Sequence, residues 1–210
     1  MSLQASREML ERDDNSQEHY HTTNLVSSTI QTIFIHPTSS IPTAIYIGIQ
    51  DAIANYNALA LGLEFSYTPN PCQETPGCPP RPPYAIIELA INPVLPTGPS
   101  ATSGFPSGGK PFPSISLGSG LAAYPRDTIE HVITHEIGHT IGYRHSDYFN
   151  RAISCGGSAT NEGSAGVGAI HITGTPTGAS AGGSLMNSCF PTGATGEFTA
   201  SDVTALEALY

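Results

Sequence analysis

Residues 134–147 read THEIGHTIGYRHSD and bring three histidines and one glutamate close together. On an α-helix each residue turns by about 100°, so His135 and His139 lie on one face, where two imidazoles can bind one zinc ion. Glu136 beside them is placed to act as a general base on a water at the metal. His145 would point away from that face on a continued helix, so the helix must end first. Gly142 predicts this end, because glycine adopts the left-handed C-terminal conformation at little cost.

The prediction from this spacing is a site with three zinc ligands, His135, His139 and His145, and an open fourth position for water. Such an open position is typical of catalytic rather than structural zinc. The alternative is a buried helix whose histidines are satisfied by hydrogen bonds. Because the glycine and the third histidine make the pattern far more specific than a short HExxH motif, we favour the metal site.

Other polar residues near the motif, and the glycine within it, have plainer interpretations. His131, one turn before the first ligand, is expected to be buried and not to bind metal. Asp147 either caps the chain or lies at the surface, or it hydrogen-bonds a ligating imidazole. Gly138 costs up to about 1 kcal/mol in mid-helix, so a close backbone neighbour is expected against it. His36 and His171 fall in strand-like runs and are expected to be ordinary residues.

Local patterns predict the elements of an α+β fold. Alternating β-branched residues indicate a strand at 28–37. Further strands are expected at 63–69, 84–93 and 114–121, with an irregular edge strand near 101–105. Apolar residues at helical spacing (Ile45, Ile49, Ile53 and Ala54) predict a helix over 39–62, capped by Ser39 or Ser40. Capping boxes of Asp127 with Glu130 and of Thr199 with Asp202 predict a second helix from about residue 128 and a terminal helix. The glycine-rich stretch 155–184 is expected to be loop, with one β-like run, GAIHITG.

Composition points to a loop-rich exported protein. Glycine (22) and proline (18) are frequent, and only 11% of residues are charged. The net charge of −10 argues against nucleic acid as a partner, because phosphates require basic surfaces. No run approaches the ~20 apolar residues that a membrane-spanning helix needs. The first residues are polar and charged, so any export signal is expected to lie outside this sequence.

The four cysteines, at positions 72, 78, 155 and 189, allow three pairings. Cys72 and Cys78 flank the turn-like QETPG, which favours a local Cys72–Cys78 disulfide and leaves Cys155–Cys189 as the second. Free thiols are the alternative, and a zinc knuckle is disfavoured because no CxxC spacing exists. Two disulfides would indicate an oxidising, extracellular compartment.

The extended motif also carries a family resemblance. HEIGHTIGYRH matches HExxHxxGxxH, the signature of the metzincin clan of zinc peptidases, and it resembles the dual-action HEIGH metallopeptidases. GGSLMNSCF resembles the clan's Met-turn, with Met186 as its methionine, and FTASDVTALEALY resembles the terminal helix of matrixins. The resemblance implies a metzincin-like zincin fold. This fold has a twisted mixed β-sheet, two long helices (a backing helix and the active-site helix) and a small loop-rich C-terminal subdomain that ends in a helix.

The chain is expected to have three parts: the first follows from its lack of apolar periodicity, and the other two are implied by the resemblance. Residues 1–22 form a mobile N-terminal segment or a pro-segment, residues 23–142 the N-terminal subdomain with the active-site helix, and residues 143–210 the C-terminal subdomain. A pro-segment would block the zinc through one of its ligand-type side chains, Asp13, Asp14, His19 or His21. Some metzincins have a tyrosine two residues after the Met-turn methionine, but this chain has Ser188 there, so no such group is expected at the metal.

The predicted activity is that of a secreted zinc endopeptidase with one catalytic Zn²⁺ and Glu136 as general base. The expected partner is a protein or peptide in extended conformation, paired with an edge strand within 98–106, and the protein is expected to be a monomer. A structural Ca²⁺ is possible but not indicated. Two rival functions stay open: a non-catalytic zinc-binding module for adhesion or recognition, and a zinc amidase that acts on cell-wall peptides.

Overall fold

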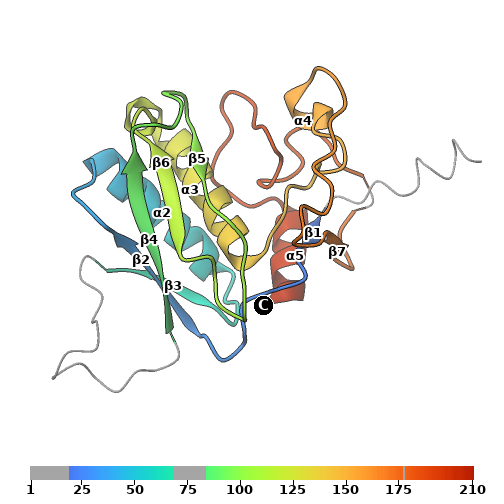
Figure 1. Ribbon diagram of the computed structural model, residues 1–210, viewed down its shortest axis with the longest axis horizontal. Coiled ribbons are helices and arrows are strands. Elements are labelled where there is room, and N and C mark those ends of the chain that lie inside the picture. Colours follow the sequence, from blue (N-terminus) through green and yellow to red (C-terminus); the bar gives the residue numbers. More distant parts are fainter. Residues whose placement is uncertain (1–18, 69–83, 177) are drawn as a thin grey trace, which may run out of the picture.

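The computed structural model describes residues 19–68, 84–176 and 178–210, and its centre is a five-stranded mixed sheet (Figure 1). The strands are β2 (Thr32–Pro37), β3 (Glu64–Tyr67), β4 (Tyr84–Asn92), β5 (Ala101–Thr102) and β6 (Ser114–Gly118). They lie in the order β3-β2-β4-β6-β5, and neighbours are parallel except for the antiparallel pair of β5 and β6. Each strand falls within its predicted range, and the α+β class with a mixed sheet is confirmed.

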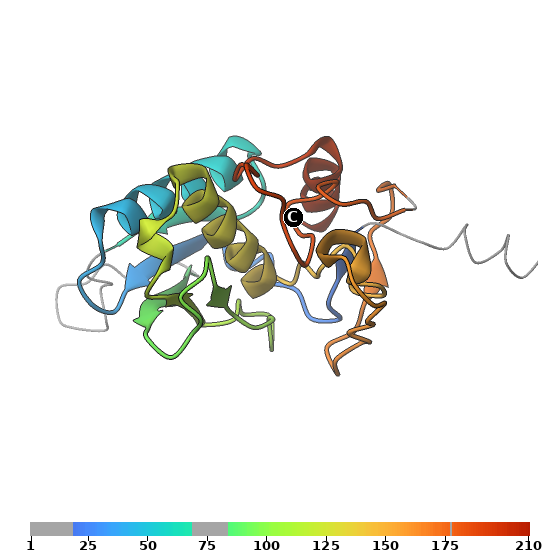
Figure 2. The same cartoon turned by 90° about the horizontal axis from the view of Figure 1, so that it is seen from above.

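Two helices cover one face of the sheet (Figure 2): α2 (Thr43–Ala58) and α3 (Arg126–Ile141). The apolar stripe of α2 is buried at Ile45, Ile49 and Ile53, as the spacing predicts. Ala54 is exposed, so its place in that stripe was wrongly predicted. It lies roughly 140° around the helix from Ile49, and the buried position is taken by Ala52.

Both helices begin at a proline and not at the predicted caps. The N-cap of α2 is Pro42, not Ser39 or Ser40, and the N-cap of α3 is Pro125. The predicted capping box of Asp127 and Glu130 is therefore wrong. Asp127 lies inside the first turn, where its carboxylate interacts favourably with the positive end of the helix dipole. The Glu130 carboxylate instead accepts a hydrogen bond from the Asn55 side chain on α2 (2.7 Å).

Beside the sheet and its two helices lies a smaller, loop-rich part of the molecule (Figure 1). It contains β1 (Tyr20–His21), α4 (Ala152–Cys155), β7 (Ile170–His171) and α5 (Ala200–Leu209), while a short 3₁₀ turn (Leu121–Ala123) precedes α3. The capping box of Thr199 and Asp202 is present at the start of α5, as predicted. The division into subdomains at residues 142 and 143 stays a proposal.

The described end of the N-terminal segment is folded, which contradicts the mobility expected up to residue 22. His19, Tyr20 and Thr22 are buried, and β1 pairs antiparallel with β7. The Tyr20 carbonyl accepts from the Arg144 backbone N–H (2.9 Å), and the Thr22 N–H donates to the Gly142 carbonyl (2.9 Å). The sequence pattern could not show this, because the hydrogen-bond partners of the segment lie more than a hundred residues later. Asp13 and Asp14 lie outside the described residues.

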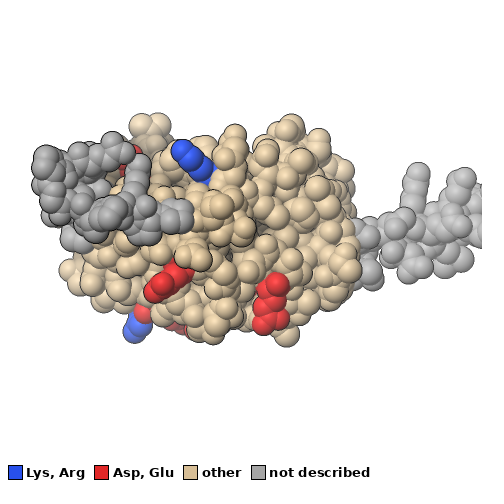
Figure 3. All heavy atoms as spheres, turned by 90° about the horizontal axis from the view of Figure 1, so that it is seen from below, with Lys and Arg blue, Asp and Glu red and all other residues tan. Residues whose placement is uncertain are grey.

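A disulfide joins Cys155, at the end of α4, to Cys189 (S–S 2.03 Å), the pairing expected for these two cysteines. The expected Cys72–Cys78 pair lies outside the described residues. In the parts of the chain that the structure describes, no helix is both long and apolar enough to cross a membrane. Among the described residues on the face in Figure 3, lysine and arginine side chains stand singly and do not form a basic stripe.

Candidate metal centre

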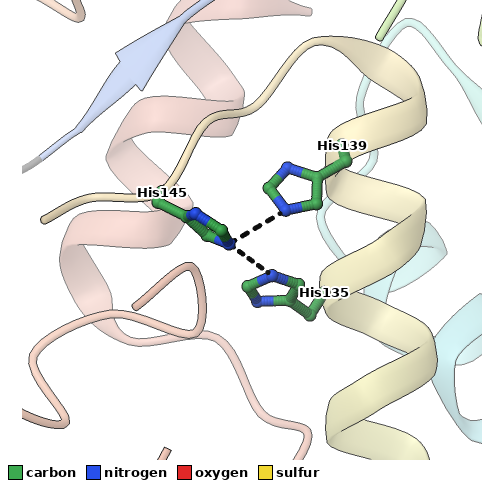
Figure 4. Close-up of side chains that lie close together, drawn as sticks. All are labelled: His135, His139 and His145. Atoms are coloured by element: carbon green, nitrogen blue, oxygen red, sulfur yellow. Dashed lines mark hydrogen bonds between the residues drawn. The ribbon is translucent and has the colours of Figure 1, made fainter. Parts of the chain in front are cut away.

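The last two turns of α3 and the chain after them build the site. Helix α3 carries His135, Glu136 and His139, and it ends at Gly142, whose φ of 107° is left-handed. The Tyr143 N–H donates back to the Gly138 carbonyl (2.9 Å), which closes the helix end. The chain then turns and returns His145 toward the other two histidines (Figure 4).

The ring nitrogens of the three histidines converge. The Nε2 atom of His145 lies 3.2 Å from Nε2 of His135 and 3.2 Å from Nε2 of His139. One ligand-type atom from each of the three lies within 4.8 Å of the others. For a tetrahedral ion with Zn–N bonds of about 2.0–2.1 Å, two ligand nitrogens stand about 3.3–3.4 Å apart, so the spacing fits such an ion.

The opposite nitrogen of each ring shows which tautomer is present. Nδ1 of His135 lies 3.0 Å from the Leu185 carbonyl oxygen, and Nδ1 of His139 lies 2.7 Å from the Tyr143 carbonyl oxygen. Nδ1 of His145 lies 2.8 Å from Oε1 of Glu162. These oxygens only accept, so each Nδ1 is the donor, and a ring in its neutral form then carries its lone pair on Nε2. Three lone pairs that face one another form a donor set for a cation.

Burial keeps the helical pair in the form that binds metal. Burial, with the neighbouring histidines, lowers the pKa of His135 well below its usual value, and burial lowers the pKa of His139 to about 3. Both rings are therefore neutral at neutral pH, as metal ligation requires.

Glu136 lies at the same site on α3. Ser103, which follows the edge strand β5, donates a hydrogen bond from Oγ to Oε2 of Glu136 (2.6 Å). Burial raises the pKa of Glu136 above its usual value, while this hydrogen bond opposes the rise. A cleft of about 440 Å³ is lined by the three histidines, Glu136 and residues 99–103. The carboxyl group and the three ring nitrogens thus share one open space.

Met186 lies directly against α3. It is fully buried, and a Cβ placed on Gly138 would stand only 2.8 Å from its Sδ. A close neighbour is therefore present, but it is a side chain and not the backbone that the mid-helix glycine suggested. The Met186 carbonyl also accepts from the Ser146 N–H (2.9 Å), next to the third histidine.

A buried carboxylate on α5 holds the segment around Met186. Asp202 accepts from the Leu185 N–H (2.9 Å), from Ser184 Oγ (2.6 Å) and from His19 Nε2 (2.9 Å). Burial raises the pKa of Asp202, but the hydrogen bonds outweigh it and hold the pKa below its usual value. His19 is thus bound to α5, away from the role of a zinc-blocking side chain. Since the Leu185 carbonyl faces His135, α5 is tied to the site through one residue.

The carboxylate beside a site histidine is that of Glu162, which the sequence motif did not predict. Asp147, the earlier candidate, is fully buried but accepts from the backbone N–H and Oγ of both Ser188 and Ser154. Burial raises the pKa of Glu162, but His145 and two arginines lower it below its usual value. One signal was in the sequence: Glu162 is the sole acidic residue between positions 148 and 196.

The remaining candidates lie apart from the three ring nitrogens. His131 is buried, and its Nδ1 lies 2.8 Å from the Thr195 carbonyl oxygen. His36 contacts the Thr68 carbonyl at the end of β2, and His171 contacts Thr175. These three histidines agree with their plainer interpretations.

The site combines a three-histidine cluster that could hold a metal ion with a carboxyl group in one cleft. The sequence model of the dual-action HEIGH metallopeptidases matches residues 1–210, so the chain belongs to this family. It is therefore a metallopeptidase.

Solved structures add a likeness of fold. One structure of myroilysin is 14% identical, with 89% of this chain and 97% of that chain covered and a TM-score of 0.50. A second, a crystal structure of myroilysin, is 13% identical, with 90% and 86% covered and a TM-score of 0.48. At such identity the likeness concerns the fold alone. No curated protein matches the sequence.

Proposed function

We propose that this metallopeptidase is a secreted zinc endopeptidase of the metzincin type, with His135, His139 and His145 as ligands and Glu136 as general base. The observation that carries the proposal is the convergence of three Nε2 lone pairs whose Nδ1 atoms all donate elsewhere. Membership of the HEIGH family supports it. The disulfide between Cys155 and Cys189 supports export, because disulfides persist in oxidising compartments.

The chemistry divides between the ion and the chain. A bound Zn²⁺ supplies a Lewis acid that polarises a peptide carbonyl and lowers the pKa of water toward about 7. Glu136 holds the proton that the attacking water loses and delivers it to the leaving amine. Its burial suits this work, because it raises the pKa of the carboxyl toward the working pH, where a group can both accept and release a proton. Ser103 keeps one carboxylate oxygen engaged and so orients the other.

The substrate is proposed to lie extended along the edge strand. β5 is the edge of the sheet, within the range expected for that strand, and residues 99–103 line the cleft. An extended peptide could add to such an edge through main-chain hydrogen bonds. Met186 beneath α3 is proposed to be the methionine of a Met-turn, and Gly142 to be the turn that returns the third ligand. One copy of the chain holds all proposed ligands, which suits a monomer.

The proposal is tested with Glu136→Gln. Wild type is expected to bind one zinc ion and to cleave casein in a chelator-sensitive way. The variant should retain the zinc and lose about 10²–10⁴-fold in kcat/KM, the usual contribution of a general base. Glu207→Gln, which makes the same change at an exposed position on α5, should keep wild-type activity.

The same experiment separates the rival functions. A recognition module would bind zinc in the wild type and show no chelator-sensitive hydrolysis between pH 5 and 9. A cell-wall amidase would cleave peptidoglycan fragments and leave casein intact. Equal cleavage by wild type and Glu136→Gln would refute the general-base assignment.

A further inference from the structure

The third histidine is held differently from the other two. His135 and His139 lie on a helix, and their Nδ1 atoms meet backbone carbonyls. His145 lies in the loop beyond the helix, so no regular element sets the direction of its ring (Figure 4). Its Nδ1 meets a side chain, Oε1 of Glu162, at 2.8 Å.

Glu162 in turn is held from several sides. Arg151 Nε lies 3.3 Å from its Oε1, and Arg144 Nη2 lies 3.4 Å from its Oε2. The Glu162 backbone N–H donates to the Tyr148 carbonyl (2.8 Å). The carboxylate side chain is only 20% exposed, so its position is set by these contacts.

Arg144 fastens the glycine-rich segment that presents the carboxylate. Its Nη1 donates to the carbonyls of Gly163 (3.0 Å) and Gly168 (2.9 Å). The guanidinium, which is almost fully buried, lies over the ring of Tyr148 at 5.0 Å from the centroid. Arg144 precedes the third histidine in the chain, so the same short loop both carries His145 and binds the segment that orients it.

We infer that Glu162 is the positioning residue of the third metal ligand, and that the segment 160–168 is folded to present it. Glu162 keeps the proton of His145 on Nδ1, fixes the plane of the ring and makes Nε2 a better donor, as carboxylates behind ligating histidines do. A neutral acceptor in place of Glu162 would preserve the direction of the His145 ring but would not supply the negative charge. The inference rests on the proposed function, since it requires His145 to bind the ion.

The test compares Glu162→Gln, Glu162→Ala and the exposed control Glu207→Gln. Zinc affinity is measured by competition with a chelator, and the melting temperature is measured without metal. Glu162→Ala should bind zinc about 10–100-fold more weakly, the usual cost of losing such a partner. Glu162→Gln should fall between Ala and wild type, because it can still accept from Nδ1. Glu207→Gln should match wild type in both measurements.

A cobalt-loaded sample supplies a reading of ligand geometry that does not depend on activity. The visible absorption of Co²⁺ should change in both Glu162 variants and stay unchanged in Glu207→Gln. If a Glu162 variant melts earlier but its folded form binds zinc as tightly as wild type, the role is structural and the inference is overturned. If Glu162→Ala does not fold, equal zinc affinity in Glu162→Gln and wild type overturns it. If wild type itself does not bind zinc, the proposed function fails instead.

Discussion

Replacing Gly142 by alanine tests whether the end of α3 delivers the third ligand. At a φ of 107° an L-residue costs about 1–2 kcal/mol more than glycine. The new Cβ would also stand 2.8 Å from Leu25 Cδ2, 2.9 Å from Thr22 Oγ1 and 3.2 Å from the Asn24 carbonyl oxygen. Overpacking of this kind adds about 1–3 kcal/mol. The free energy of unfolding should therefore fall by about 2–5 kcal/mol, a large share of a typical 5–15 kcal/mol.

The new Cβ would be crowded from one side, the side of residues 22–25. The side chains of Leu25 and Thr22 can rotate, but the Asn24 carbonyl oxygen is a backbone atom. The chain relieves that contact by moving away from residues 22–25, and the next segment carries His145. We therefore expect zinc affinity in the folded protein to fall about tenfold or more, which corresponds to about 1.4 kcal/mol. The assay pairs urea unfolding of the metal-free protein with zinc competition under conditions where the protein is folded.

Gly174→Ala is the matched control. Gly174 has a similar φ of 96°, but the nearest atom to a new Cβ is Thr204 Cγ2 at 3.6 Å. This variant should lose about 1–2 kcal/mol of stability from the backbone alone and bind zinc like wild type. If Gly142→Ala also binds zinc within twofold of wild type, the glycine does not deliver the third ligand and the reasoning is refuted.

Three further predictions concern the surroundings of the site. Ser103→Ala removes the hydrogen bond that lowers the Glu136 pKa, so the acidic limb of kcat/KM should move to higher pH; an unmoved limb contradicts the assigned contact. The paired change Cys155→Ser and Cys189→Ser opens a loop with a sequence separation of 34 and should cost about 4 kcal/mol in urea unfolding; a loss under about 1 kcal/mol would disagree. Asp202→Asn should destabilise the protein by about 1–3 kcal/mol at pH 7, because an amide nitrogen replaces one of the buried carboxylate oxygens that accept from Ser184 and Leu185. Because the folded pKa of Asp202 is lowered, its contribution is complete above the unfolded pKa of about 3.9 and is lost as pH falls through the folded value. Wild type and variant should therefore converge in acid, and parallel stability curves would argue against this linkage.

The core of the site followed from local geometry. The i, i+4 spacing of His135 and His139 depends only on the pitch of an α-helix, and the stop at Gly142 depends only on backbone sterics. Strand β2 was equally predictable, because its residues alternate between buried and half-buried along the strand. The first residues of the helices were less predictable. Serine and acidic residues were the predicted N-caps, but the N-cap of each long helix is a proline.

Contacts between segments that are distant in the chain could not be predicted from the sequence. Glu162 orients His145 from a glycine- and serine-rich loop that has no periodicity. The one sequence signal for Glu162 was that no other acidic residue lies near it in the chain. The burial of His19 and Tyr20 depends on partners in β7 and α5. No local pattern records such partners, because the side chains that meet were not neighbours in the chain.

The amino-acid order alone was enough to place the two helical histidines, the glutamate beside them, the turn after them and most strand positions. All of these follow from the regular rotation of a helix or strand and from the freedom of glycine. Tertiary packing was needed for the sulfur of Met186 against Gly138, the carboxylate behind the third histidine and the pairing of the N-terminal strand β1 with β7. These contacts join residues that are far apart in the chain, and which of them meet is decided by the packing of the whole molecule.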